Sequence, residues 1–154
     1  MSSSSSDPPG WLVIETLLRA GRAAIDELHR RLAERGHPDV RPAHGYAFQA
    51  IGGDGATATE LGRRLGVTKQ AAGQMVDELV RFGYVARGAD PFDGRRRLVT
   101  LTPSGVDCLV KSAQIFEELL AEWRASGVDV DAAIGALRGL EALYGGPEGL
   151  RPIW

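Results

Sequence analysis

The sequence predicts a mainly α-helical protein with one small β-hairpin. Apolar residues recur at helical spacing in the first and last thirds of the chain. Near the middle, two short helices with capping residues are joined by a tight turn that contains a glycine, which is the helix-turn-helix arrangement. Two short segments of strand composition follow around a polar loop. This order predicts a winged helix-turn-helix flanked by long helices.

The composition favours one compact domain. The chain has 154 residues, of which 44% are hydrophobic and 25% charged, as in ordinary globular proteins. We expect a disordered tail at 1–9 and a single domain at 10–154, with its helix-turn-helix core at about 42–102. The longest stretch without a charged residue has twelve residues, against roughly 20 in a membrane helix. With no signal peptide, the expected location is cytoplasmic, and no membrane partner is expected.

The first element is a long helix over about 11–35. Residues such as Ile14, Leu17, Leu28 and Leu32 give it an apolar surface wider than one face. Gly36 and the proline after it end the helix. A terminal helix with so broad an apolar surface needs more than one packing partner, and a second subunit could be one of them.

The central elements are predicted from their capping residues. A short apolar piece at 43–51 is closed by a glycine-rich loop at 52–55. Thr57 and Glu60 form a capping box that begins a helix, and Gly66 ends it. Thr68 caps the next helix, which stops at about residue 82.

A hairpin and two further helices complete the chain. Strand composition covers 84–87 and 98–102, and a polar loop lies at 90–97 between them. Thr102 and Pro103 are a cap and a first helical residue, and the helix they begin runs over about 103–126. A last helix is predicted at about 130–144. With the helix at 11–35, these two are the expected dimerisation helices.

The helix after Thr68 has the pattern of a DNA recognition helix. Ala72, Val76, Leu79 and Val80 form its predicted inward face. The opposite face carries short polar side chains that can donate to or accept from base edges in the major groove. The residues assigned to DNA reading are Thr68, Lys69, Gln70, Gly73 and Gln74.

The loop of the hairpin carries three adjacent arginines, Arg95, Arg96 and Arg97. They suit phosphate contacts or insertion into a narrow minor groove. Asp93 is interpreted as a local clamp that orients an arginine. The charges are segregated accordingly, because residues 61–100 have a net charge of +4 and the rest of the chain −6. Double-stranded DNA is therefore the expected partner.

No catalytic constellation is visible, so neither an enzymatic activity nor a cofactor is expected. His37 and His44 lie seven residues apart across prolines, which makes a metal site a weak alternative. Cys108 is interpreted as a buried structural thiol, and a single cysteine excludes an internal disulfide. An apolar pocket between helices would need aromatic and polar side chains. The candidates for such an effector pocket are Trp11, His44, Tyr46 and Phe48.

The segment from Thr57 to Gly105 resembles the multiple antibiotic resistance regulator (MarR) family of bacterial transcription factors. The resemblance rests on LGRRLGVTKQAAGQMVDEL at 61–79, DPFDGR at 90–95 and LTPSG at 101–105. It implies a homodimer that binds a pseudo-palindromic operator with one winged helix per half-site. It also implies small aromatic or phenolic effectors near the junction of the two regions. Gly94 departs from a frequent arginine, and Cys108 is not at the position used by peroxide-sensing members.

The sequence thus favours a dimeric, sequence-specific DNA-binding regulator, with repression as its expected effect, released by a small aromatic effector. The alternative is a winged-helix module that binds a protein or senses a ligand without reading DNA. A small-molecule carrier or enzyme built in the dimer pocket is a third and weaker reading.

Overall fold

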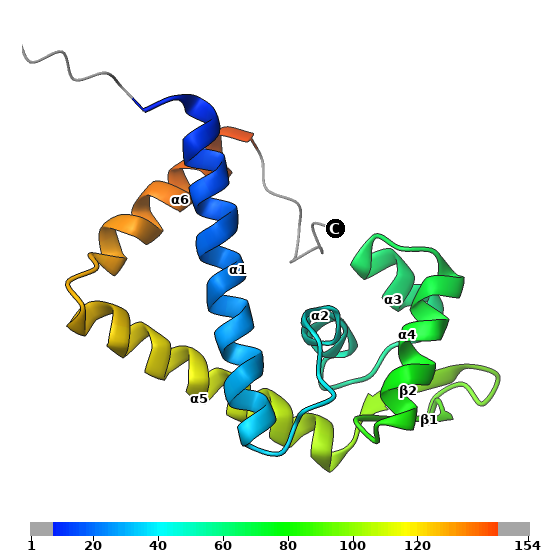
Figure 1. The fold of residues 1–154 in the computed structure, drawn as a ribbon. Coiled ribbons are helices and arrows are strands. Elements are labelled where there is room, and N and C mark those ends of the chain that lie inside the picture. The colour runs from blue at the N-terminus through cyan, green and yellow to red at the C-terminus, as the bar shows by residue number, and fades with distance from the viewer. Residues whose placement is uncertain (1–7, 145–154) are drawn as a thin grey trace, which may run out of the picture.

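The computed structural model describes residues 8–144 and confirms the mainly helical fold with one hairpin (Figure 1). Within this range the predicted helices lie within one or two residues of their expected bounds. The elements are α1 (Gly10–Glu34), α2 (Pro42–Ile51), α3 (Ala58–Leu65), α4 (Lys69–Arg81), β1 (Val85–Ala89), β2 (Arg97–Leu101), α5 (Pro103–Ala125) and α6 (Val130–Tyr144).

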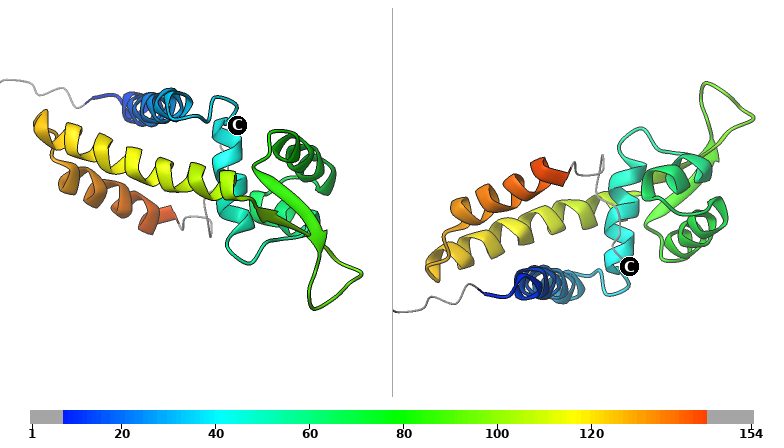
Figure 2. Two further views of the ribbon diagram at one scale, coloured as in Figure 1. Left: turned by 90° about the horizontal axis from the view of Figure 1, so that it is seen from below. Right: turned by 90° about the horizontal axis from the view of Figure 1, so that it is seen from above.

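Three helices form a frame at one end of the molecule. The long helices α1 and α5 pack against each other near the end of α1, and α6 turns back from the end of α5 toward the start of α1. The helices α2, α3 and α4 and the hairpin lie together at the other end (Figure 2). We call α1, α5 and α6 the frame, and the segment from α2 to β2 the head.

The hydrophobic core lies in the head and at its junction with the frame. Phe48 and Ile51 of α2 are buried, and Leu61 of α3, Leu79 of α4 and Ile115 of α5 are buried with them. The predicted inward face of α4 is confirmed at Ala72, Val76 and Leu79. It is wrong at Val80, which is 38% exposed although the neighbouring Leu79 is fully buried.

The hairpin is antiparallel, and Val85 pairs with Leu101 at its base. Both strands are shifted toward the loop by one or two residues from their predicted bounds. Ala56, just before α3, exchanges backbone hydrogen bonds of 2.9 and 3.0 Å with Val99 of β2. This bridge attaches the hairpin to the start of the helix-turn-helix, and no local pattern of residues predicts it.

Two glycines are required by the local geometry. Gly66 follows α3 in the left-handed conformation, with φ of 68°, which permits the tight turn into α4. Gly105 lies so close to the hairpin that a Cβ at this position would be 2.2 Å from the carbonyl oxygen of Tyr84. The start of α5 is therefore held against the base of the hairpin.

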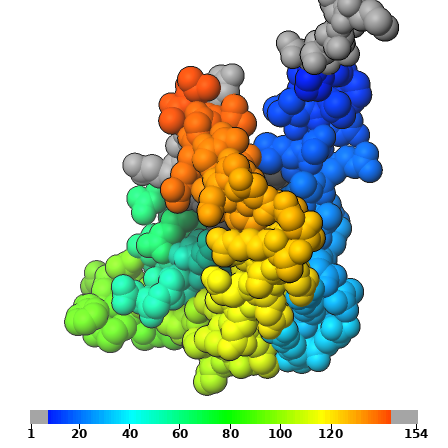
Figure 3. Space-filling view, turned by 90° about the vertical axis from the view of Figure 1, so that its left-hand side faces the viewer, coloured from blue at the N-terminus to red at the C-terminus, as the bar shows by residue number. Residues whose placement is uncertain are grey.

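The frame leaves large apolar side chains exposed. Trp11, Ile14 and Leu18 of α1 are more than half exposed, and Leu137 and Leu140 of α6 are each 41% exposed. A groove of about 1060 Å³ runs between α1, α5 and α6 and is lined mainly by apolar side chains. Figure 3 shows α1 and α6 standing apart at one end of the molecule. Within residues 8–144, no helix is long and apolar enough to cross a membrane.

Candidate nucleic-acid interface

Capping interactions fix the helix-turn-helix. The Thr57 hydroxyl accepts a hydrogen bond from the Glu60 backbone N–H at 3.2 Å, and the Glu60 carboxylate accepts from the Thr57 N–H at 2.8 Å. The Thr68 hydroxyl accepts from the Ala71 N–H at 3.1 Å at the start of α4. Both caps predicted for the helix-turn-helix are confirmed; the first determines where α3 begins and the second where α4 begins.

The outer side of α4 is open to solvent. Thr68, Lys69, Gln70 and Gln74 are exposed, and Gly73 is half-buried. The five predicted reading residues lie at the N-cap and on the first two turns of α4. Their side chains have the donors and acceptors that base edges recognise, although their assignment to DNA remains a prediction.

Arg87 of β1 joins the hairpin to this helix. Its guanidinium is 2.5 Å from the Asp77 carboxylate and 3.4 Å from the Gly73 carbonyl oxygen. It therefore neutralises an acidic side chain on the outer side of α4 and fixes the angle between hairpin and helix. The pattern of the sequence did not reveal this pair, because the two residues lie on different elements.

We call the loop at 90–97 the wing. Its turn is closed by Asp93, whose carboxylate accepts from the Arg95 backbone N–H at 3.0 Å and whose carbonyl accepts from the Arg96 N–H at 2.9 Å. Asp93 therefore orients the backbone of the turn, and no contact with an arginine side chain is present within the described residues. The wing projects away from the rest of the molecule (Figure 2).

The three wing arginines have different environments. One Arg96 nitrogen is 2.7 Å from the Glu60 carboxylate, and the other is 3.4 Å from Asp90, which is only 7% exposed. Arg95 and Arg97 are exposed, and their side chains have no ion pair within residues 8–144. The structure thus places Arg96 against α3 and leaves Arg95 and Arg97 free to meet an anion.

The other charged side chains of the head also divide into paired and unpaired groups. Glu78 of α4 contacts Arg41 and lies 3.7 Å from Arg81. It also accepts a hydrogen bond from buried His44 at 3.2 Å. In the segment from residue 61 to 100, each acidic side chain thus has an ion pair or a hydrogen bond. Four cations of this segment have neither an ion pair nor a side-chain hydrogen bond within the described part of the chain, namely Arg63, Lys69, Arg95 and Arg97, whereas Arg64 donates to the Ala50 carbonyl oxygen.

His44 is neutral in this arrangement. Burial lowers its pKa to about 4, and the nearby charge of Arg41 acts in the same direction. Its Nδ1 accepts from the Arg41 backbone N–H at 3.2 Å, and its Nε2 faces Glu78. Because one ring nitrogen accepts and the other donates, the neutral tautomer satisfies both contacts.

The four candidate effector residues are not brought together. Tyr46 and Phe48 line a cavity of about 200 Å³ between α1, α2 and α5. His44 lies on another side of α2, with its ring 6.2 Å from that of Phe82. Trp11 lies at the start of α1 and is 65% exposed. The cavity lining contains no acidic or basic side chain apart from His29.

Cys108 also lines this cavity and is buried, as predicted. Burial raises the pKa of its thiol to about 11, so little thiolate forms near neutral pH. His37 contacts Tyr84 and Asp107, and His44 contacts Glu78. Across residues 8–144, no group of three or more His, Cys, Asp or Glu side chains could hold a metal ion.

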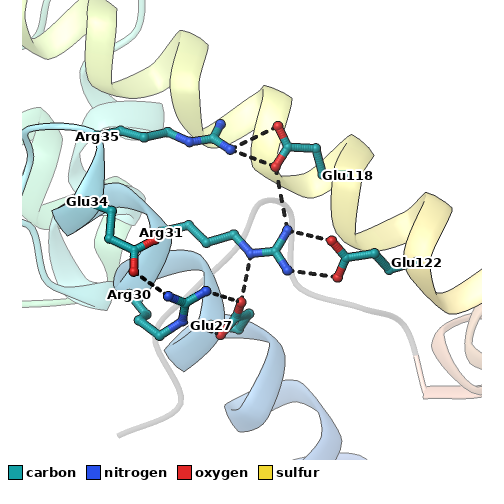
Figure 4. Close-up of polar contacts among 7 residues, drawn as sticks. All are labelled: Glu27, Arg30, Arg31, Glu34, Arg35, Glu118 and Glu122. Atoms are coloured by element: carbon teal, nitrogen blue, oxygen red, sulfur yellow. Dashed lines mark hydrogen bonds and ion pairs between the residues drawn. The ribbon is translucent and has the colours of Figure 1, made fainter.

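An ionic network sets the crossing of α1 and α5 (Figure 4). Arg31 donates to Glu27 of its own helix at 2.7 Å and to Glu122 of α5 at 2.7 Å. Arg35 donates to Glu118 at 2.7 Å. Hydrogen bonds from Arg30 and Arg31 lower the pKa of Glu27 to about 2. The side chain of Arg31 is only 16% exposed, so this network lies at the junction of the frame and is no free anion site.

Comparison with known proteins identifies the same region. A model of the MarR family matches residues 39–96, which extend from just before α2 to the wing. No curated protein matches the sequence.

Solved structures share the fold over most of its length. RV1404 from Mycobacterium tuberculosis is 21% identical, with a TM-score of 0.69 over 93% of this chain and 99% of that chain. FabT from Streptococcus pneumoniae, solved in complex with DNA, is 20% identical, with a TM-score of 0.69 over 88% and 95%. A probable transcriptional regulator from Pseudomonas aeruginosa is 27% identical, with a TM-score of 0.57 over 84% and 94%.

Proposed function

We propose that this chain is a DNA-binding transcriptional regulator of the MarR family, whose model matches residues 39–96. One observation carries the proposal most directly. The unpaired cations Arg63, Lys69, Arg95 and Arg97 all belong to the helix-turn-helix and the wing, where every acidic side chain is already engaged. A surface with uncompensated positive charge and an exposed polar helix is suited to bind a nucleic acid, whose phosphates are anionic and whose base edges offer hydrogen-bond donors and acceptors.

In this proposal, the first two turns of α4 enter the major groove. Gln70 and Gln74 are exposed, so each amide can donate to and accept from an adenine edge. Lys69 reaches a guanine edge or a phosphate, and half-buried Gly73 permits close approach of the helix. Arg95 and Arg97 bind the minor groove or its phosphates, while Arg96 holds the wing in place.

The working form in this proposal is a homodimer formed by the frame. The apolar side chains exposed on α1 and α6 and the groove beside them are the surface that a second copy would cover. Two copies would bind a pseudo-palindromic operator, with half-sites roughly 34–36 Å apart. FabT, whose fold is similar, was solved bound to DNA, which supports DNA as the partner.

We further propose repression, relieved by a small aromatic effector. The cavity between α1, α2 and α5 supports this, because it adjoins both frame and head and is lined by Tyr46 and Phe48. Its volume of about 200 Å³ is comparable to a cavity that holds a single aromatic ring. An occupant there would shift α2 relative to α1, and α2 contacts α4 through the Arg41 and Glu78 pair.

The test is selection of bound duplexes from a random pool, followed by fluorescence anisotropy on the selected sequence with and without phenolic compounds. The proposal predicts enrichment of a two-fold symmetric site and weaker binding when an effector is added. Absence of any enriched sequence, together with capture of a specific protein partner through the wing, would favour the interaction module instead.

A further inference from the structure

The wing carries an aromatic side chain that the proposed function has not used. Phe92 is 98% exposed, the highest value among the large apolar side chains of the described chain. Its ring has no aromatic or cation–π partner within residues 8–144. Single exposed apolar residues are common, but a ring this exposed gains almost nothing from folding.

The backbone beneath Phe92 is held in place. The Phe92 N–H donates to the Asp90 carboxylate at 2.8 Å, and the Asp90 N–H donates to the Arg96 carbonyl at 3.1 Å. Arg96 is in turn attached to Glu60 at the start of α3. The tip of the wing is thus linked to the helix-turn-helix by hydrogen bonds and an ion pair, and the Phe92 ring is exposed on this held loop.

The charge around Phe92 narrows the choice of partner. Arg95 and Arg97 on the same loop lack ion pairs, so an anionic surface is favoured. One aromatic side chain beside two arginines would hold a lipid surface only weakly, because stable anchoring needs a larger apolar area. DNA fits better, since arginines enter narrow minor grooves and apolar side chains next to them insert at base steps.

We propose that Phe92 is an apolar wedge that enters the minor groove beside Arg95 and partly opens a flexible pyrimidine–purine step of the bound duplex. The inference rests on the proposed function, because it requires the wing to lie on DNA. Phe92 thereby adds a preference for deformable steps under the wing, at positions where no side chain reads a base edge.

The experiment uses the full-length protein and a selected duplex with 2-aminopurine placed in turn at each step under the wing. Phe92→Gln removes the ring, and Phe92→Leu keeps an apolar side chain. Both leave the backbone bond to Asp90 in place, and thermal melting checks that both fold. We expect Phe92→Gln to bind about tenfold more weakly and to lose the fluorescence increase of the unstacked base. Phe92→Leu is expected to retain most of the affinity and most of the fluorescence increase. The salt dependence of binding is expected to stay unchanged in both variants, because neither substitution removes a charge.

The possible results separate the wedge from the proposed function. Wild-type affinity and fluorescence for Phe92→Gln would overturn the wedge alone, as would a wild-type complex with no fluorescence increase at any step. A wild-type protein that binds no duplex at low salt would overturn the proposed function and the wedge together.

Discussion

The head and the frame of this molecule differ in how much of their apolar surface is buried. In the head, Phe48, Leu61 and Leu79 are each at most 1% exposed, so α2, α3 and α4 complete a core within one chain. In the frame, Ile14 is 56% and Leu140 41% exposed, and the groove beside them stays open. One chain thus buries the apolar surface of its head, whereas much of the apolar surface of its frame stays exposed. Substitutions in the two regions are therefore expected to have different effects.

The largest effect is expected from a charge in the frame. We expect Leu17→Asp with Leu140→Asp to give a folded monomer that binds the operator at least about a hundredfold more weakly, because two linked half-sites then act separately. Sedimentation and DNA titration measure the two properties. The matched control is Arg138→Gln, which removes an exposed charge from α6 and is expected to leave the dimer intact. A double variant that remains dimeric would contradict the role given to the frame.

The second prediction compares a leucine of the head with one of the frame. Leu79 is fully buried, so Leu79→Ala is expected to lower the free energy of unfolding by about 2–5 kcal/mol. Leu143 is 74% exposed in one chain, and in the monomeric frame variant Leu143→Ala is expected to change the free energy of unfolding by less than about 0.5 kcal/mol. Chemical denaturation provides both values. Equal losses of unfolding free energy in the two variants would contradict a core that lies in the head and at its junction with the frame.

The third prediction concerns pH and the junction of α2 with α4. His44 has a pKa lowered to about 4 by burial, so the folded state binds its proton less readily than the unfolded state does. Stability from this group is therefore complete above about pH 6.5 and is lost as the pH falls toward 4, by an amount on the order of 3 kcal/mol. His44→Gln is expected to flatten this part of the stability profile. An unchanged profile in the variant would assign the acid sensitivity to other groups.

The fourth prediction tests base reading. Gln70→Ala is expected to weaken binding to the selected operator by about 1–3 kcal/mol and to leave binding to random duplex nearly unchanged. The reason is that a glutamine amide reads a base edge and carries no charge. Competition titrations with both duplexes give the comparison, with exposed Gln49 on α2 as the control position. An equal loss of affinity for both duplexes would show that Gln70 does not read a base.

Local signals in the sequence were sufficient for most of the fold. Caps at Thr57, Thr68 and Thr102 predict where helices begin, because each cap depends on residues within three positions of it. The same holds for the turn at Gly66. The inward face of α4 also followed from helical periodicity, except at Val80, which is 38% exposed.

Contacts between distant segments could not be predicted in this way. Arg96 pairs with Glu60, 36 residues away, and Arg31 pairs with Glu122 across 91 residues. Three adjacent arginines look equivalent in the sequence, yet the fold attaches one of them to α3 and leaves two in solvent. Trp11 is separated from Tyr46 and Phe48 because α1 is 25 residues long and its first turn lies away from the head (Figure 1).

The salt dependence of operator binding in two wing variants distinguishes the free arginines from the bound one. We predict that wild-type affinity falls steeply with salt and that Arg95→Gln with Arg97→Gln lowers the logarithmic slope by roughly 1 for each arginine lost per subunit. Arg96→Gln is expected to weaken binding with little change in slope, because its guanidinium holds the wing to Glu60 and Asp90. A wild-type affinity insensitive to salt, or an equal loss of slope in both variants, would contradict the account.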